Sequence, residues 1–454
     1  MSRFDGRRLE PEVFKLDVER MRAGWYSDRY FVNIQRILSR FAAEGLSYQG
    51  GDPYHAPPGV NLHAVRVGDI EVEMQWFPRR KPWALVCGVD KALAILRECT
   101  GTTDASGAWR STADRLQVWA VQDGDIAPYN GDPMQVRPVI RVRGRYRDFA
   151  ILETATLGAL TRSSRVATNV YTILDAAAGK PVLFFPARFD AHEIQAMDGY
   201  AYHIAVKRYA EDNPHRATDS RVSTDAQGDW WGGYGGGTVA HAAIACFLGD
   251  AAATMLAFAE SLDPAIPRIA LVDFRNDCVG DTLRTMDALW PRWLAAARAG
   301  DEEDARRYVL EGVRPDTSGS MRDVSVPPTG NPRLDNGVNE RLVRILREAM
   351  DAAWTRWNVP PEWEEAARRW CRSVGIIATG GFKPEKIRRF EEQRVPVDAY
   401  GVGSWCFRND DETSTDFTAD IVRVKVNGEW IPMAKAGRAP ADNPDLKPVD
   451  MSGA

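Results

Sequence analysis

The chain has 454 residues, of which 44% are hydrophobic and 27% are charged, and its formal net charge is −5. A chain of this length can bury a large core and is typical of two domains. The balance of charge gives no basic field for a nucleic acid, and no apolar run approaches the roughly 20 residues of a membrane span. Six scattered cysteines, without a CxxC pair or close Cys/His spacing, argue against a compact zinc site and indicate reduced thiols in a cytoplasmic protein.

The first 150 residues alternate in the manner of antiparallel sheet. Residues 65–76 predict a hairpin around a Gly68-Asp69 turn, and residues 116–121 and 139–142 predict further short strands separated by loops such as 125–131. Helical patterns over residues 30–41 and 91–97 flank these strands. This part of the chain is therefore expected to be an α+β domain.

From residue 151 the pattern changes to helices alternating with short apolar strands. The expected elements are strands at 182–185, 269–273 and ending at 314, and helices at 193–209, 238–261, 282–298 and 339–357. Alternation of this kind predicts a parallel sheet, and its length suits a closed barrel. The last residues return to a hairpin pattern, 421–426 and 430–434 around Asn427-Gly428, and are expected to rejoin the first domain. The expected domains are thus 1–150 completed by 408–454, and 151–407.

Two glycine clusters follow the last two strands of the expected barrel. Residues 374–382 read VGIIATGGF, residues 397–404 read VDAYGVGS, and an amphipathic stretch over 383–393 separates them. Without a Cβ, Gly380, Gly381, Gly401 and Gly403 let backbone N–H groups approach an anion closely. Loops after the last two strands of a (β/α) barrel commonly hold phosphate, so these residues and Ser404 form a candidate phosphate site.

Eight segments occur in the order and rough spacing seen in nicotinate phosphoribosyltransferases, and the chain resembles that family over nearly its whole length. The segments are SDRYF (27–31), VIRVRGRYRDFAILETATLGAL (139–160), GGTVAH (236–241), LVDF (271–274), GVRPDTSG (312–319), TGGF (379–382), DAYGVGS (398–404) and AKAGR (434–438). The resemblance implies a type II phosphoribosyltransferase: an irregular (β/α) barrel with a discontinuous α+β N-terminal domain. It also implies transfer of the ribosyl 5-phosphate of phosphoribosyl pyrophosphate (PRPP) to nicotinate with Mg²⁺, in NAD salvage. Family members form homodimers in which the N-terminal domain of one subunit covers the barrel mouth of the other.

The resemblance also implies roles for residues at the barrel mouth. His241 follows a glycine turn at a helix start, where it either caps the helix or faces pyrophosphate; in ATP-stimulated members the matching histidine is transiently phosphorylated. Arg314 and Asp316 are either a surface ion pair or an arginine facing phosphates and an aspartate holding ribose hydroxyls. Thr238 precedes His241 and is expected to bind substrate. No residue is assigned as a metal ligand.

The residues expected to bind the base depart from the family pattern. Arg188 is the one arginine that remains of a family pair that clamps the nicotinate carboxylate, because Phe189 stands in the place of the second. Tyr30 matches a tyrosine that stacks on the pyridine ring across the dimer interface, and Thr168 matches a small-residue turn in which Asn169 replaces a lysine. The aromatic loop 230–234 is either a hydrophobic plug or a wall that stacks on a flat ligand, and the second interpretation is favoured.

Other functions stay open at this point. A phosphoribosyltransferase for another heteroaromatic base, such as nicotinamide, quinolinate or a specialised compound, would carry the same phosphate site. Quinolinate has a second carboxylate and should need more arginines than the loop at Arg188 supplies. A non-catalytic nucleotide-binding relative is the remaining alternative.

Overall fold

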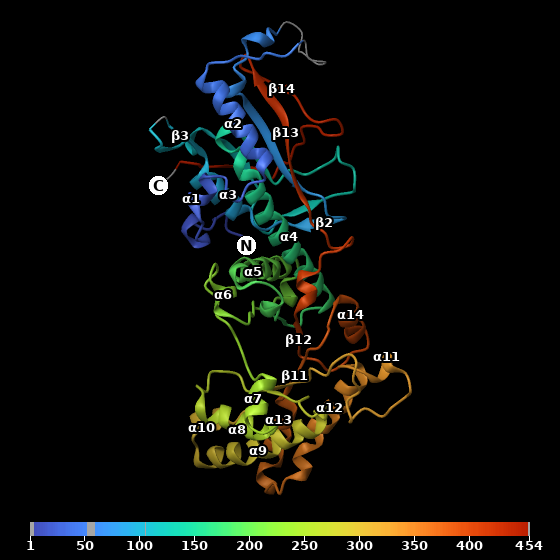
Figure 1. Cartoon of the computed structure of the whole chain (residues 1–454). Coiled ribbons are helices and arrows are strands. Elements are labelled where there is room, and N and C mark those ends of the chain that lie inside the picture. The colour runs from blue at the N-terminus through green and yellow to red at the C-terminus, as the bar shows by residue number, and fades with distance from the viewer. Residues whose placement is uncertain (1–3, 52–59, 105, 453–454) are drawn as a thin grey trace.

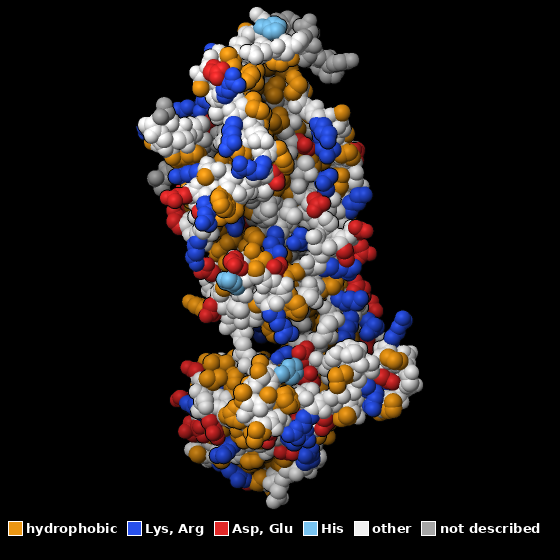
Figure 2. All heavy atoms as spheres, in the orientation of Figure 1, with side chains coloured by type: hydrophobic (Ala, Val, Ile, Leu, Met, Phe, Trp, Pro, Cys, Tyr) orange, Lys and Arg blue, Asp and Glu red, His pale blue; other side chains and the backbone are white. Residues whose placement is uncertain are grey.

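The computed structural model describes residues 4–51, 60–104 and 106–452. The molecule is elongated, as its space-filling view shows (Figure 2), with a large sheet and its helices at one end and a group of helices at the other (Figure 1). Within the described ranges, no helix is both long and apolar enough to cross a membrane.

An antiparallel sheet of six strands dominates the upper half of the molecule in Figure 1. In spatial order its strands are β14 (Glu429–Pro432), β13 (Phe417–Val426), β1 (Glu71–Pro78), β7 (Ile140–Arg145), β5 (Gln117–Ala120) and β15 (Lys447–Val449). Both ends of the chain thus contribute to one sheet. Two small ladders accompany it, β2 (Trp83–Leu85) with β6 (Ile126–Pro128) and β3 (Gly101–Thr103) with β4 (Trp109–Ser111).

A parallel sheet of five strands lies in the other half of the molecule. Its order is β8 (Val182–Phe184), β12 (Ala399–Val402), β11 (Gly375–Ala378), β10 (Gly312–Arg314) and β9 (Ile269–Leu271). Single parallel bridges extend the β8 edge, from Phe184 to Val222 and from Val222 to Gly235. In the described ranges no pairing joins Gly235 to β9, so the wall is an irregular, incomplete barrel and not the closed one that its length suggested.

Fourteen helices are described, and they cover both sheets. They are α1 (Val18–Arg22), α2 (Arg29–Ala43), α3 (Val89–Cys99), α4 (Glu153–Ala176), α5 (Gln195–Asp212), α6 (Asp225–Gly228), α7 (His241–Cys246), α8 (Ala251–Ser261), α9 (Cys278–Ala299), α10 (Glu302–Arg307), α11 (Pro332–Asp335), α12 (Glu340–Ala352), α13 (Glu364–Ser373) and α14 (Pro384–Glu392). Helices α7 to α10, α12 and α13 gather at the lower end in Figure 1.

Helix α4 ties the two halves together. Its N-terminal part places Leu160 in the core beneath the antiparallel sheet, and its later turns place residues such as Val166 and Ile173 in the core around the parallel sheet. At the crossing with α3, a Cβ added to Gly88 would lie only 2.5 Å from the Ala159 carbonyl oxygen. A glycine is needed at this contact because the two backbones meet there directly.

The C-terminal hairpin is confirmed, and two other predicted elements are altered in detail. The C-terminal hairpin turns at Asn427 and Gly428, with φ values of +52° and +88°, as a type I′ turn requires. The helix expected over 238–261 is interrupted between α7 and α8, where Leu248 and Gly249 have φ values of +58° and +81°. The loop expected over 125–131 contains the short strand β6.

The hairpin expected over residues 65–76 is wrong. A short 3₁₀ helix at Val67–Asp69 leads into the single strand β1, which lies inside the sheet between β7 and β13. A Cβ on Gly68 would lie 2.2 Å from the Ala42 backbone nitrogen, so this segment packs directly on helix α2. Close contact between backbones, and not a turn, is the reason for the glycine.

Candidate functional site

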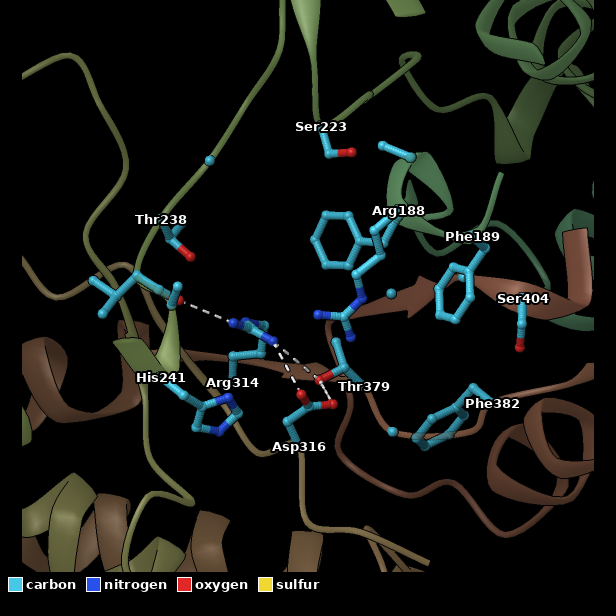
Figure 3. Close-up of a pocket in the computed structure, with 18 of the residues that line it drawn as sticks. Arg188, Phe189, Ser223, Thr238, His241, Arg314, Asp316, Thr379, Phe382 and Ser404 are labelled. Carbon is cyan, nitrogen blue, oxygen red and sulfur yellow. Dashed lines mark hydrogen bonds and ion pairs between the residues drawn. The ribbon is translucent and has the colours of Figure 1, made fainter. Parts of the chain in front are cut away.

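A cavity of about 630 Å³ opens at the carboxyl ends of the parallel strands. Segments that follow β8, β10, β11 and β12 line it, together with the stretch of residues 236–242 that leads into α7. Figure 3 shows Phe382 and Ser404 on one side of the cavity, His241 and Thr238 on the other, and Arg188, Arg314 and Asp316 between them. Residues from five separate parts of the barrel half therefore meet at one opening, as in other sites of parallel α/β folds.

Two glycine turns form the side of the cavity near Phe382 and Ser404. In the first, Gly380 and Gly381 have φ values of +88° and +68°, a conformation that residues with a side chain rarely adopt. In the second, Cβ atoms on Gly401 and Gly403 would lie 2.6 Å from the Thr379 methyl and 2.5 Å from the Phe189 ring. Gly380 and Gly381 are thus needed for the backbone conformation of the first turn, and Gly401 and Gly403 for the close approach of neighbouring side chains to the second.

The backbone N–H groups of these turns are free to bind an anion. Those of Gly380, Gly381, Gly403 and Ser404 donate to no backbone or side-chain acceptor in the described part of the chain. Several free N–H groups that face one opening form a nest for a phosphate group.

Arg314, Asp316 and Thr379 form one hydrogen-bonded group at the centre of the site. The Thr379 hydroxyl donates to Asp316 Oδ1 at 2.7 Å, and Arg314 Nη1 lies 3.6 Å from Asp316 Oδ2. Arg314 also donates to the Val239 carbonyl oxygen at 3.0 Å, which ties β10 to the segment before α7. Burial lowers the pKa of the Arg314 guanidinium, and the Asp316 carboxylate opposes this effect. Arg314 and Asp316 are thus a cavity pair and not a surface pair.

His241 begins helix α7 and is held by an aspartate from the next strand. His241 Nε2 lies 2.9 Å from Asp273 Oδ1, just beyond β9. The histidine side chain is 47% exposed and the aspartate only 9%, so the ring reaches into the cavity while its partner lies behind it. Burial raises the pKa of Asp273, and the His241 ring opposes this effect. The contact orients the imidazole and leaves Nδ1 free to face a ligand.

Arg188 is the cation of the cavity with no partner for its charge. It lies in the 3₁₀ helix Ala187–Phe189 after β8, and no hydrogen bond or ion pair joins it to the described residues. Its guanidinium lies 5.6 Å from the centroid of the Phe189 ring. The rings of Phe185, Phe189 and Phe382 line the same opening. One free guanidinium beside aromatic surface suits a flat ligand with a single acidic group.

The structure brings together nearly all of the barrel residues singled out from the sequence. Those that line the cavity are Arg188, Thr238, His241, Arg314, Asp316, Gly380, Gly381, Gly401, Gly403 and Ser404.

Thr168 and Tyr30 lie elsewhere. Thr168 is 2% exposed within α4, where its hydroxyl accepts from the Leu85 N–H at 2.9 Å and donates to the Ser164 carbonyl oxygen at 2.6 Å. Its hydrogen-bonding capacity is used inside the fold, so the expected substrate contact is not supported. Tyr30 is 62% exposed on α2, in the antiparallel half of the chain.

The aromatic loop at 230–234 is a plug and not a ligand wall. Trp230 is buried against Phe14, and Trp231 stacks on the His203 ring at 4.5 Å. Tyr234 is exposed, but it does not line the cavity. The interpretation favoured from the sequence is therefore wrong, because the two tryptophans fill the space around α5 and α6.

Sequence reasoning missed Thr379, Phe382 and the pairing of His241 with Asp273. Thr379 and Phe382 flank the first glycine turn and belong to the TGGF segment, but only its glycines were assigned a role. Asp273 could not be paired with His241 in advance, because 32 residues separate them and only the packing of α7 beside β9 joins them.

The cavity offers few ligands for a metal ion. In the described part of the chain no group of three or more His, Cys, Asp or Glu side chains could hold one. Asp316 is the one carboxylate among the lining residues, since Asp273 lies behind His241. A single carboxylate fits Mg²⁺ that keeps most of its ligands from water and from phosphate oxygens of a substrate.

Comparisons with known proteins agree with this picture of the fold. Residues 61–164 match the family model described as quinolinate phosphoribosyl transferase, N-terminal domain. Nicotinate phosphoribosyltransferase pncB2 of Mycobacterium tuberculosis is 25% identical over 312 residues, which are 68% of this chain and 52% of that protein. The chain thus spans about half the length of the curated relatives it matches.

Two solved structures share the fold over most of their length. Nicotinate-nucleotide pyrophosphorylase from Pyrococcus furiosus superposes with a TM-score of 0.60 at 23% identity, covering 94% of this chain and 81% of that one. Human nicotinic acid phosphoribosyltransferase gives a TM-score of 0.53 at 17% identity, covering 88% and 74%.

Proposed function

We propose that the chain is a type II phosphoribosyltransferase and acts as a nicotinate phosphoribosyltransferase, which the matched family model and the similar proteins support. It would join nicotinate to the ribosyl 5-phosphate of PRPP, giving nicotinate mononucleotide and pyrophosphate in NAD salvage. The observation that carries the proposal is a single cavity with a phosphate-sized N–H nest on one side and an unpaired arginine among aromatic rings within the same opening.

Each end of PRPP has a natural place in this cavity. The glycine turns would bind the 5-phosphate through their free N–H groups. Asp316 would accept hydrogen bonds from the ribose hydroxyls, since Thr379 already orients its carboxylate. Arg314 and His241 would face the pyrophosphate, whose developing charge they would stabilise.

The reaction needs no general base. The pyridine nitrogen attacks C1 of the ribose with its lone pair, and the C1–O bond breaks so that pyrophosphate leaves with the bonding electrons. The protein contributes by holding the two reactants in line and by lowering the free energy of the separating charges. Mg²⁺ would enter with PRPP and neutralise pyrophosphate, and Asp316, which lines the same cavity, would hold some of its waters.

ATP stimulation is a further part of the proposal. A histidine whose Nε2 is fixed by Asp273 presents Nδ1 as a nucleophile toward a phosphoryl group. His241 is placed in this way, and the segment before it, 235–237, is a run of three glycines.

Quinolinate is the second candidate substrate, because the family model matched by residues 61–164 bears its name. Quinolinate carries two carboxylates, whereas Arg188 is the one unpaired arginine among the residues that line the cavity; Arg314 is engaged with Asp316 and Val239. The charge of the base side therefore favours a monocarboxylate.

We also propose that the enzyme is a cytoplasmic homodimer with its site at the subunit interface. All six cysteines are free thiols, which suits a reducing compartment. Exposed aromatics include Trp25 and Tyr30 near α2, and Phe274, whose ring centroid lies 6.5 Å from that of His241 at the cavity. Apolar surface of this kind is typical of protein contacts, and one copy could cover the other's cavity.

The test is pyrophosphate release by the full-length chain with PRPP, Mg²⁺ and one base at a time: nicotinate, nicotinamide or quinolinate. Release with nicotinate at a kcat/KM well above the other two is the expected result, and ATP is added in a parallel series. Release with quinolinate alone would reject the assignment of the base but keep the transferase. No release and no binding of PRPP would reject both.

A further inference from the structure

Lys386 lies directly behind the first glycine turn, on the first turn of α14. Its Nζ donates a hydrogen bond to the Gly380 carbonyl oxygen at 3.4 Å and lies 4.0 Å from the centroid of the Phe382 ring. Phe390 lies beyond it, with the ring centroid 5.9 Å from Nζ. The ammonium is therefore enclosed between the turn that lines the cavity and two aromatic rings.

The charge of Lys386 has no counter-ion of its own. No carboxylate oxygen of the described residues lies within ion-pair distance of its Nζ. The charged groups that face it are Glu340 from α12 and Arg389 from α14, and these two form an ion pair with each other. The pKa of Lys386 is lowered to about 8, mainly by burial; Glu340 opposes this shift and Arg389 adds to it. A desolvated cation of this kind gains free energy when an anion binds near it.

The phosphate side of the cavity otherwise lacks a cation. Arg188 and Arg314 are the arginines among the lining residues, which include no lysine, and Figure 3 places both at the centre of the site, away from Ser404. A bound phosphate dianion would meet backbone N–H groups and the Ser404 hydroxyl at the glycine turns, all of them uncharged. Lys386 is the charge behind the first of these turns.

We propose that Lys386 is a positioning residue for the 5-phosphate, holding the first glycine turn by the Gly380 carbonyl and supplying the positive charge behind it. The inference rests on the proposed function, since it takes the phosphate to be that of PRPP. Lys386 makes no contact with the reacting atoms, so its effect is on phosphate affinity and not on the transfer step.

The proposal makes phosphate affinity depend on pH. A phosphate monoester is fully dianionic above pH 7, because its second pKa is about 6. Its own charge is therefore constant from pH 7 to pH 9, while Lys386 in the free protein loses its proton around pH 8. Binding at pH 9 must then be accompanied by uptake of a proton, which weakens the affinity.

The experiment is calorimetric titration of the full-length protein with ribose 5-phosphate and with PRPP at pH 7 and pH 9. The wild-type Kd for both ligands should rise about tenfold between pH 7 and pH 9, because the protonated fraction of a group that titrates near 8 falls about tenfold over this interval. Lys386→Met keeps the apolar contacts of the side chain. It should bind both ligands about tenfold more weakly than the wild type at pH 7, and as tightly as the wild type at pH 9. Lys386→Arg stays charged and should restore binding at both values.

Lys383→Met is the matched control. Lys383 lies three residues before Lys386 and its side chain is exposed, so the substitution removes the same charge from the surface. It should leave the Kd and its pH dependence unchanged, and steady-state kinetics should show Lys386→Met raising the KM for PRPP with little change in kcat or in the KM for the base. Wild type that binds PRPP with a flat profile from pH 7 to pH 9 overturns the inference even if both variants fail to fold, as does tight binding by Lys386→Met. Wild type that binds neither ligand overturns the proposed function first, and Lys386 with it.

Discussion

At the scale of single residues, the base side of the cavity is set by one substitution within a familiar pattern. Phe189 stands where the resemblance leads one to expect a second arginine, and its ring packs on Gly403. A Cβ on Gly403 would lie 2.5 Å from that ring, so the second glycine turn and Phe189 fit each other. Where the resemblance implies a second charge the cavity has aromatic surface, and Arg188 is the arginine proposed to bind the carboxylate.

Arg188→Ala should therefore raise the KM for nicotinate about 10- to 100-fold, the cost of losing a hydrogen-bonded charge contact. The KM for PRPP should change little, because the arginine does not face the glycine turns. Steady-state kinetics with each substrate varied in turn measure both values. Arg369→Ala, on the exposed side of α13, is the matched control; equal increases for both substrates would contradict the role of Arg188.

At the scale of helices and strands, contacts between backbones explain why a turn-like sequence does not always form a turn. The Gly68-Asp69 pair has the composition of a turn, yet Gly68 lies against the Leu38 carbonyl and the Ala42 nitrogen of α2. The Asn427-Gly428 pair also has turn composition and forms the turn. The two cases differ because only the first has a helix packed against it.

Gly68→Ala should destabilise the protein by about 1–3 kcal/mol, since its Cβ would overlap backbone atoms that cannot move alone. Gly158→Ala is the comparison, because the position is exposed within α4 and a Cβ there meets no atom within 4 Å. It should stabilise the protein by about 0.5–1 kcal/mol, as alanine does in a helix. Urea denaturation of both variants measures the difference, and equal midpoints would mean that the α2 contact yields easily.

At the scale of the whole molecule, a buried carboxylate joins the two halves of the chain. Asp123 accepts a hydrogen bond from the Val89 N–H at the start of α3 and lies 3.3 Å from the Tyr200 hydroxyl on α5. Burial, together with the charge of the neighbouring Asp90, raises the pKa of Asp123 to about 8. Both groups donate to the Asp123 carboxylate, and the Val89 N–H opposes the rise in pKa that burial causes.

Stability should accordingly fall as pH rises toward 8. Because the folded pKa lies above that of the unfolded chain, the stabilising effect of Asp123 is complete below about pH 4 and is lost as pH passes through about 8. Asp123→Asn cannot ionise, so its slope of unfolding free energy against pH should be smaller by about 1.4 kcal/mol per unit between pH 5 and 7. Denaturation curves at several pH values check this, and parallel slopes for the two proteins would contradict it.

The proposed dimer gives a second prediction at this scale. If Tyr30 of one subunit completes the cavity of the other, Tyr30→Ala and Arg188→Ala chains expressed together should recover about a quarter of wild-type activity. Half of the dimers are then mixed, and each has one intact site of two. Arg188→Ala with Arg314→Ala is the control and should recover none, because both changes lie on the barrel side. Recovery in neither pair would mean that Tyr30 does not act across subunits.

The sequence by itself determined the elements whose signals are local: the parallel alternation after residue 151, the turn at Asn427-Gly428 and the glycine turns at the cavity. Their residues were predictable because φ preference and hydrophobic period act within a few positions. Only the tertiary structure decided that Thr168 and Trp231 are internal, that Asp273 holds His241 and that Lys386 lies behind Gly380 without a counter-ion. These outcomes depend on which segments pack together. The sequence around a residue looks the same whether its side chain packs inside the fold or faces a ligand, so local patterns cannot tell the two apart.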